Sequence, residues 1–164
     1  MKVSGSAIKL GSNIDTDVIL PGKYLVLISP NDLAKHAMED VDPDFTSKVK
    51  KGDFVVGGRN FGLGSSREHA PRVLKMNGVS AVIAQSVARI FFRNSINIGL
   101  PVIIADTRKI KEGNELDVDL TAGTLKNLST GDQLTFSRLP EVMIKILNEG
   151  GLVPYVKKYG TLKI

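Results

Sequence analysis

The segment from Gly62 to His69, with the sequence Gly-Leu-Gly-Ser-Ser-Arg-Glu-His, concentrates side chains able to do chemistry. Its two glycines allow a tight turn and let a bound molecule approach the backbone closely. A helix is predicted to begin near Arg67, and free N–H groups at a helix start favour anionic ligands. The Arg67 guanidinium can also donate two parallel hydrogen bonds to a carboxylate. The segment therefore predicts a site for a small anion, with a carboxylate as the best candidate.

The hydroxyl groups in this segment also have a purely structural interpretation. Ser65 and Glu68 match the spacing of a capping box, in which both side chains bond to backbone N–H groups at a helix start. A serine that acts as a nucleophile or base needs a partner, and His69 is the only nearby candidate. His69 is equally well interpreted as a buried or half-buried hydrogen-bonding residue. The glycines match neither a P-loop nor a dinucleotide fingerprint.

Two further groups of charged side chains could serve as ligands, but each also has a structural interpretation. Asp15 and Asp17 lie two residues apart, which suits a hard cation, but no third ligand is apparent. The alternative is a turn in which the Asp side chains bond to nearby amides. Arg89 and Arg93 lie four residues apart on one face of a predicted helix, and we interpret them as surface charges.

The composition is that of an ordinary globular protein, predicted as one domain over residues 1–164. Of the 164 residues, 42% are apolar and 24% are charged. The chain has no cysteine and two histidines, so we predict no disulfide and no metal held by this chain alone. The net charge of +5 comes from dispersed basic residues, and aromatic residues make up 5% with no tryptophan. So few aromatic side chains offer little surface for stacking on nucleic-acid bases, so we predict no nucleic-acid partner.

The localisation is predicted to be cytoplasmic, without membrane contact. The first residues lack the apolar stretch of a signal peptide. The longest apolar runs, such as residues 79–84, are far too short to cross a bilayer.

Hydrophobic runs separated by turn residues predict an α/β fold with a mainly parallel central sheet and short additional strands. A strand, a helix and a strand at this spacing indicate a crossover with parallel pairing. The predicted strands are 3–10, 54–57, 79–84 and 102–105, followed by short strands at 114–120, 123–128 and 132–136. The predicted helices are 30–38, one from about 68–70 to 78, 87–96, and a closing helix at 139–150.

Several motifs in order resemble the small subunits of isopropylmalate isomerase, the swivel-domain partners within the aconitase superfamily. They are Asn13–Asp17, Gly58–Gly62, Gly64–Pro71, Ser86–Asn94 and Asn97–Pro101, so the resemblance spans almost the whole chain. It implies a swivelling β/β/α domain and a small dicarboxylate substrate. It also implies a large-subunit partner, in a heterodimer or heterotetramer. That partner would carry a 4Fe–4S cluster on three cysteines, and this chain would bind no cofactor itself.

The resemblance also implies roles for individual residues. Ser65 matches the serine that acts as the catalytic base and removes a carbon-bound proton. Ser66 and Arg67 match residues that bind the substrate carboxylate. Asp17 matches an acidic residue that supports the site, and we expect His69 to be a second supporting residue.

The segment Tyr24, Leu25, Val26 and Leu27 matches the substrate-binding loop that reads the variable side group in this family. Homoaconitase-like members resemble Tyr-Leu-Arg-Thr there, with an arginine available for an extra carboxylate. Val26 and Leu27 are apolar and suit an isopropyl group, whose burial is worth about 2 kcal/mol. An unpaired extra carboxylate would cost more than that. The alternative is that Val26 and Leu27 simply pack in the core.

The function implied by the resemblance is that of a hydro-lyase subunit in leucine biosynthesis. Such an enzyme interconverts 2-isopropylmalate and 3-isopropylmalate through 2-isopropylmaleate. The alternatives are a subunit of a methylmalate/citraconate hydratase, a subunit of a homoaconitase, or a non-catalytic RNA- or anion-binding protein on the same fold.

Overall fold

Parallel and antiparallel strands meet at the first strand of the chain to form one seven-stranded sheet, in the order β4-β3-β2-β1-β5-β6-β7. The computed structural model describes residues 1–161, and residues 162–164 of the predicted domain lie outside the described residues. The strands are β1 (Lys2–Lys9), β2 (Phe54–Val56), β3 (Ala81–Ala84), β4 (Val102–Ile104), β5 (Glu115–Asp119), β6 (Thr124–Asn127) and β7 (Gln133–Thr135). The helices are α1 (Thr16–Ile19), the 3-10 helix η1 (Gly22–Val26), α2 (Pro30–Ala34), α3 (Phe45–Lys48), α4 (His69–Met76), α5 (Arg89–Asn97), α6 (Glu141–Asn148) and α7 (Leu152–Tyr159).

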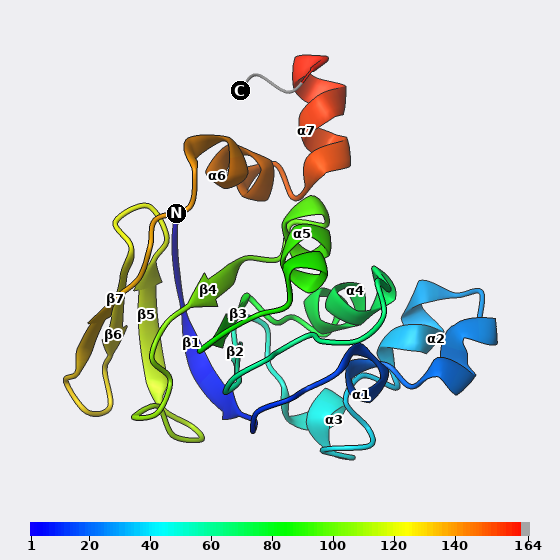
Figure 1. The fold of residues 1–164 in the computed structure, drawn as a ribbon, viewed down its shortest axis with the longest axis horizontal. Helices are drawn as coiled ribbons and strands as arrows, with labels where there is room; N and C mark the ends of the chain where they lie inside the picture. Colours follow the sequence, from blue (N-terminus) through cyan, green and yellow to red (C-terminus); the bar gives the residue numbers. More distant parts are fainter. Residues whose placement is uncertain (162–164) are drawn as a thin grey trace.

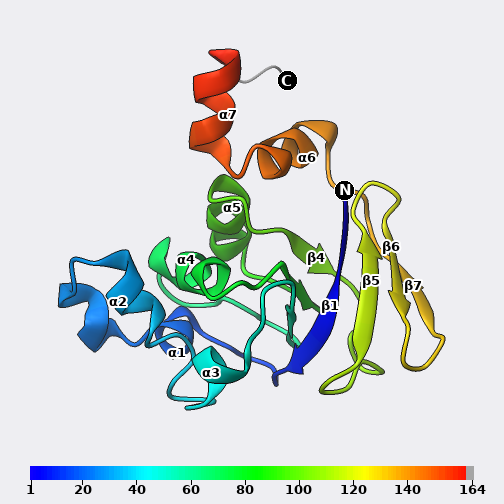
Figure 2. The same cartoon turned by 180° about the vertical axis from the view of Figure 1, so that it is seen from behind.

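Strands β1 to β4 form the parallel half of the sheet, with α4 and α5 in the connections between β2, β3 and β4. Every residue of β2 and β3 is buried, as expected for parallel strands that are covered on both faces. Helices α1 to α4 lie beside these strands, while β5 to β7 curl away on the other side (Figures 1 and 2). The predicted parallel crossovers are therefore confirmed.

The antiparallel half begins where β5 pairs with β1 and continues through β6 and β7. In β5 buried residues alternate with more exposed ones, which is the pattern of a strand with one covered face. All three predicted short strands are present, each within the predicted range. The fold is thus α/β with additional short strands, as predicted.

The core lies in two layers on opposite faces of the sheet. Val55 and Val82 pack into the layer under the helices, together with Phe61 and Phe91. Their neighbours along the same strands, such as Phe54, pack into the layer enclosed by the antiparallel strands. This division follows from the pleat, because successive side chains of a strand point to opposite faces.

The prediction of a closing helix at 139–150 is partly wrong, because α6 is followed by a further helix, α7. Pro154 makes this segment look unsuitable for a helix, yet it is the third residue of α7, where no helical hydrogen bond needs its N–H. Gly151, with a φ of +136°, makes the sharp turn between the two helices. Tyr155 of α7 is buried against Ile96 and Ile146.

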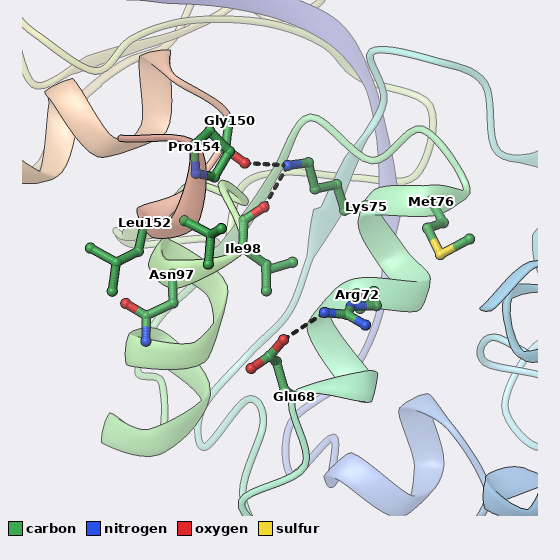
Figure 3. A pocket seen from close by; sticks show the side chains of 10 residues that line it. Glu68, Arg72, Lys75, Met76, Asn97, Ile98, Gly150, Leu152 and Pro154 are labelled. Atoms are coloured by element: carbon green, nitrogen blue, oxygen red, sulfur yellow. Dashed lines mark hydrogen bonds and ion pairs between the residues drawn. The ribbon is translucent and has the colours of Figure 1, made fainter. Parts of the chain in front are cut away.

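A cleft of about 490 Å³ lies between α4, α5 and the C-terminal helices. The Lys75 ammonium on α4 donates hydrogen bonds to the carbonyl oxygens of Ile98 and Gly150, and the Glu68–Arg72 pair lines the same cleft (Figure 3). Burial lowers the pKa of Lys75 from its ordinary value. These hydrogen bonds tie the turn before α7 to α4 and α5.

Candidate active site

The loops that follow β1, β2 and β3 meet at one edge of the parallel half. Isolated parallel bridges join Asp15 to Leu63 and Phe61 to Val87, so the three loops continue the strand order beyond the sheet. The carboxyl ends of parallel strands share one edge, and this is where ligands bind in open α/β sheets. The segment from Gly62 to Glu68 belongs to the middle loop and lies between the other two, and His69 begins α4.

Two glycines let the middle loop pass close to its neighbours. Gly62 has a φ of +73°, and a Cβ there would lie 2.2 Å from the Phe91 ring. Its N–H donates to the carbonyl oxygen of Ile14 at 2.6 Å. Gly64 has a φ of +99°, and a Cβ there would lie 3.2 Å from the Thr16 hydroxyl. The close approach of Gly62 to Phe91 explains why this turn needs glycine.

Replacing Gly62 by alanine is expected to lower the free energy of unfolding by about 3 kcal/mol or more, because a strained φ and a steric clash add together. Gly113→Ala is the matched control, since Gly113 has the same φ of +73° and no atom lies within 4 Å of its Cβ position. The control should lose only about 1 kcal/mol, from φ alone. Urea unfolding of both variants measures the difference, and equal losses would contradict the packing argument.

Ser65 is exposed, and its hydroxyl lies 3.1 Å from the hydroxyl of Thr16. Thr16 is only 1% exposed and also donates to the Ser65 carbonyl oxygen at 3.3 Å. Helix α4 begins at His69, and its N-cap residue Glu68 makes no capping bond through its side chain. The capping-box interpretation of Ser65 is therefore wrong, because the bond to Thr16 holds this serine ahead of the helix.

The backbone around Ser65 offers unused hydrogen-bond donors. Within residues 1–161, none of the N–H groups from Gly64 to Glu68 donates a hydrogen bond to another residue. A run of unbonded N–H groups beside a helix start is a favourable place for negative charge. This arrangement agrees with the anion site expected from the sequence.

Arg67 is held by Asp17, whose carboxylate accepts a hydrogen bond from the guanidinium. Gly22, the first residue of η1, lies beside them, because a Cβ there would be 3.3 Å from Nη1 of Arg67. A guanidinium carries five N–H donors, so the pair leaves Arg67 with donors for a ligand. Asp15 accepts from the N–H of Asp17 at 2.5 Å and caps α1, which confirms the turn interpretation for Asp15.

Asn94 on α5 holds the next residue of the loop. Its side-chain amide donates to the carbonyl oxygen of Ser66 at 2.9 Å, and Ser66 itself is exposed. Asn94 and Thr16 thus fix the backbone of the two serines from two different helices, α5 and α1. Sequence reasoning assigned them no role, although both lie within the motifs that carried the family resemblance. Their position in those motifs was the signal available.

His69 is exposed, so the alternative that it is a buried or half-buried hydrogen-bonding residue is wrong. No hydrogen bond or ion pair joins its side chain to another residue in the described part of the chain. It occupies the first position of α4, where a side chain does not need to enter the core. Within the described residues no hydrogen bond or ion pair therefore links His69 to the other predicted site residues, and its supporting role stays a prediction.

The predicted substrate-binding segment divides into exposed and packed residues. Val26 is 83% exposed and Leu25 is partly exposed, whereas Leu27 packs against the core. The ring of Tyr24 also packs there, and its hydroxyl donates to Glu39 at 2.5 Å. The core-packing alternative is therefore right for Leu27 and wrong for Val26.

The remaining findings concern two surface arginines, metal binding and membrane-spanning helices. Arg89 and Arg93 are exposed, as expected for surface charges. Within residues 1–161 the structure shows no group of three or more His, Asp or Glu side chains able to hold a metal ion. None of the helices in this part of the chain combines the length and the apolar composition needed to cross a membrane.

Comparison with known proteins identifies the family. The model of the aconitase C-terminal domain matches residues 30–107. The chain is 59% identical over 165 residues to the 3-isopropylmalate dehydratase small subunit 2 of Archaeoglobus fulgidus, and the match covers 100% of both chains. The chain belongs to the 3-isopropylmalate dehydratase small-subunit family.

Other members of this family agree in sequence and structure. The isopropylmalate/citramalate isomerase small subunit of Methanocaldococcus jannaschii is 55% identical over 158 residues, covering 95% of this chain and 94% of that protein. A crystal structure of 3-isopropylmalate dehydratase from the same organism has a TM-score of 0.93 at 44% identity, and covers 98% of this chain and 96% of that one. The predicted family and fold are confirmed.

Proposed function

We propose that the chain is the small subunit of an isopropylmalate isomerase, a hydro-lyase of leucine biosynthesis in the cytoplasm. With a large subunit it interconverts 2-isopropylmalate and 3-isopropylmalate through 2-isopropylmaleate. The observation that carries the proposal is the exposed residue Ser65 within a run of unbonded N–H groups, two residues before Arg67, whose guanidinium pairs with Asp17. Such a half-site is open to a partner chain. The names of the two relatives from Archaeoglobus fulgidus and Methanocaldococcus jannaschii, both small subunits, support the same assignment.

In this proposal Ser65 is the catalytic base. Its Oγ takes the proton from the substrate carbon as the hydroxyl group leaves, and returns a proton after the unsaturated intermediate has reoriented. A serine hydroxyl is far too weak an acid to be ionised without help. The unbonded N–H groups from Gly64 to Glu68 and the nearby positive charge of Arg67 supply electrostatic stabilisation for the alkoxide.

The substrate carboxylate is assigned to Ser66 and Arg67. Arg67 can form two parallel hydrogen bonds with a carboxylate, which fixes both the position and the plane of the ligand. Asp17 supports this role, because its ion pair with Arg67 restricts the guanidinium before the substrate arrives.

The iron–sulfur cluster implied by the family does not fit the residues of this chain. The sequence contains no cysteine, and the described residues include no cluster of three potential ligands. We therefore propose that the large subunit carries the 4Fe–4S cluster, which supplies Lewis-acid chemistry when bound. The residues of this chain then act on the substrate from the opposite side.

The exposed residue Val26 leads to a prediction about specificity. Val26→Arg is expected to lower kcat/KM for isopropylmalate by about 30-fold, the equivalent of losing about 2 kcal/mol of isopropyl burial. Activity on homoaconitate, which has an extra carboxylate, should be unchanged or higher. Steady-state assays of the assembled complex measure both values.

Val153→Arg is the control for this substitution, because Val153 is an exposed valine on α7. It should leave the preference between substrates unchanged. If Val26→Arg also leaves it unchanged, the segment Tyr24–Leu27 does not set specificity.

A wider substrate range is the second candidate. The relative from Methanocaldococcus jannaschii, at 55% identity, is named as acting on both isopropylmalate and citramalate. A segment with exposed Leu25 and Val26 suits either aliphatic group, since neither substrate brings an additional charge.

Co-expression with candidate large subunits, followed by anaerobic assays on isopropylmalate, citramalate and homoaconitate, tests the proposed function. We expect activity only when both chains are present, with isopropylmalate among the substrates. RNA binding by this chain alone, with no gain of dehydratase activity from any large subunit, would instead indicate a non-catalytic protein.

A further inference from the structure

A cluster of four side chains ties η1 to the turn that follows α2. The hydroxyl of Tyr24 donates to Oε1 of Glu39 at 2.5 Å, and Nζ of Lys23 lies 3.3 Å from the same oxygen. Nδ1 of His36 lies 2.8 Å from Oε2. Both oxygens of the Glu39 carboxylate are therefore engaged by side chains, two of which come from η1.

Ring stacking between Tyr24 and His36 also joins η1 to the turn that follows α2. The rings of Tyr24 and His36 are parallel to within 9°, with their centroids 3.6 Å apart. The ammonium of Lys23 lies 4.9 Å from the centroid of the Tyr24 ring, within range of a cation–π interaction. Hydrogen bonds from Tyr24 and His36 lower the pKa of Glu39, so this carboxylate remains charged at neutral pH. Together these contacts restrict both the ring and the hydroxyl of Tyr24.

The cluster lies next to the candidate active site along the chain. Gly22, two residues before Tyr24, lies against the guanidinium of Arg67. Leu25 and Val26 follow directly after Tyr24 and are exposed. The orientation of these two apolar side chains therefore depends on how firmly Tyr24 is held.

We propose that Glu39 is a positioning residue for substrate specificity. It fixes Tyr24, and through Tyr24 it sets the orientation of Leu25 and Val26, without touching the substrate itself. This inference rests on the proposed role of Tyr24–Leu27 in reading the side group of the substrate. Small displacements of groups that position a substrate have large kinetic effects, so a contact outside the site can control selectivity.

The test is Glu39→Ala in the assembled complex, assayed on isopropylmalate and on citramalate. We expect KM for isopropylmalate to rise by about 10-fold, with kcat changed less than about 2-fold, because the base and the carboxylate binders are untouched. KM for citramalate should change less, since its methyl group makes fewer contacts, so the ratio of the two kcat/KM values should fall. Glu39→Gln keeps an acceptor for the Tyr24 hydroxyl and should restore most of the ratio.

Glu149→Ala is a closely matched control. Glu149 also accepts from a tyrosine hydroxyl, that of Tyr159 at 3.1 Å, and pairs with Lys158 at 2.6 Å. Lys158 lies 5.3 Å from the centroid of the Tyr159 ring, so the control disrupts a similar cluster of glutamate, tyrosine and lysine that has no histidine. Thermal unfolding and assembly with the large subunit should be similar for both variants, and only Glu39→Ala should alter the selectivity ratio.

The outcomes separate the inference from the function on which it rests. If Val26→Arg changes selectivity but Glu39→Ala leaves the ratio within about 2-fold, the positioning role is overturned and the role of the segment stands. If Glu39→Ala lowers activity on both substrates equally, its effect is merely structural and the inference is again wrong. If neither substitution affects selectivity, both proposals fail.

Discussion

Replacing Ser65 by alanine is expected to lower kcat of the assembled enzyme by about 10²- to 10⁴-fold, the usual contribution of a positioned acid–base group. KM should change little, because Ser66 and Arg67 remain to bind the carboxylate. The bond to Thr16 is the only side-chain hydrogen bond of Ser65 within the described residues, so its loss should leave folding and assembly intact.

Ser47→Ala provides the control, since Ser47 is also exposed and, among the described residues, its hydroxyl donates only to a nearby backbone carbonyl oxygen, that of Asp44. It should have normal kcat. Single-turnover assays and gel filtration of both complexes separate chemistry from assembly. A Ser65→Ala enzyme with kcat within about 10-fold of normal would show that another group is the base.

Replacing Arg67 by lysine is expected to lower kcat/KM by about 100-fold, mainly through KM. An ammonium is a single point charge and cannot reproduce the two parallel hydrogen bonds of a guanidinium to a carboxylate. The lysine would also have to satisfy Asp17, which is bound to Arg67 in the structure. Conserving the charge at this position therefore does not conserve the function.

Arg72→Lys tests whether the effect is specific to position 67. Arg72 forms an ion pair with Glu68 at 2.7 Å and lies on α4, outside the proposed set of binding residues. Exposed pairs of this kind contribute little, so this variant should be within about 2-fold of normal. Steady-state assays over a range of isopropylmalate concentrations give KM for both, and equal small changes would argue against carboxylate binding by Arg67.

Much of the fold was predictable because its strands are short apolar runs bounded by glycine, proline and polar turns. The buried strands β3 and β4 and the helix between them are clear in the sequence for this reason. Helix α7 was not predicted, because Pro154 reads as a helix breaker unless the first residue of the helix is already known. That boundary depends on the turn at Gly151, which is a tertiary feature.

The sequence indicates which residues form the candidate site, but not which other residues they contact. The sequence singles out Ser65 and Arg67, yet the bond from Thr16 to Ser65 joins residues 49 positions apart. No local pattern reveals such a contact, since it depends on three loops meeting at one edge of the sheet. The interpretation of Ser65 as a capping residue failed for the same reason. Glu39 was missed because a lone glutamate in a turn has no distinctive spacing.

The exposed stretch after η1 has a consequence for how this protein can evolve. Leu25, Val26 and Ile28 contribute little to the core, with Ile28 97% exposed, while Tyr24 anchors one end and Ser29 caps α2 at the other. Amino-acid substitutions at exposed positions usually alter the free energy of unfolding by less than about 0.5 kcal/mol. If this segment reads the substrate as proposed, new substrate preferences are therefore accessible by drift or by saturation libraries here, without compensating mutations elsewhere.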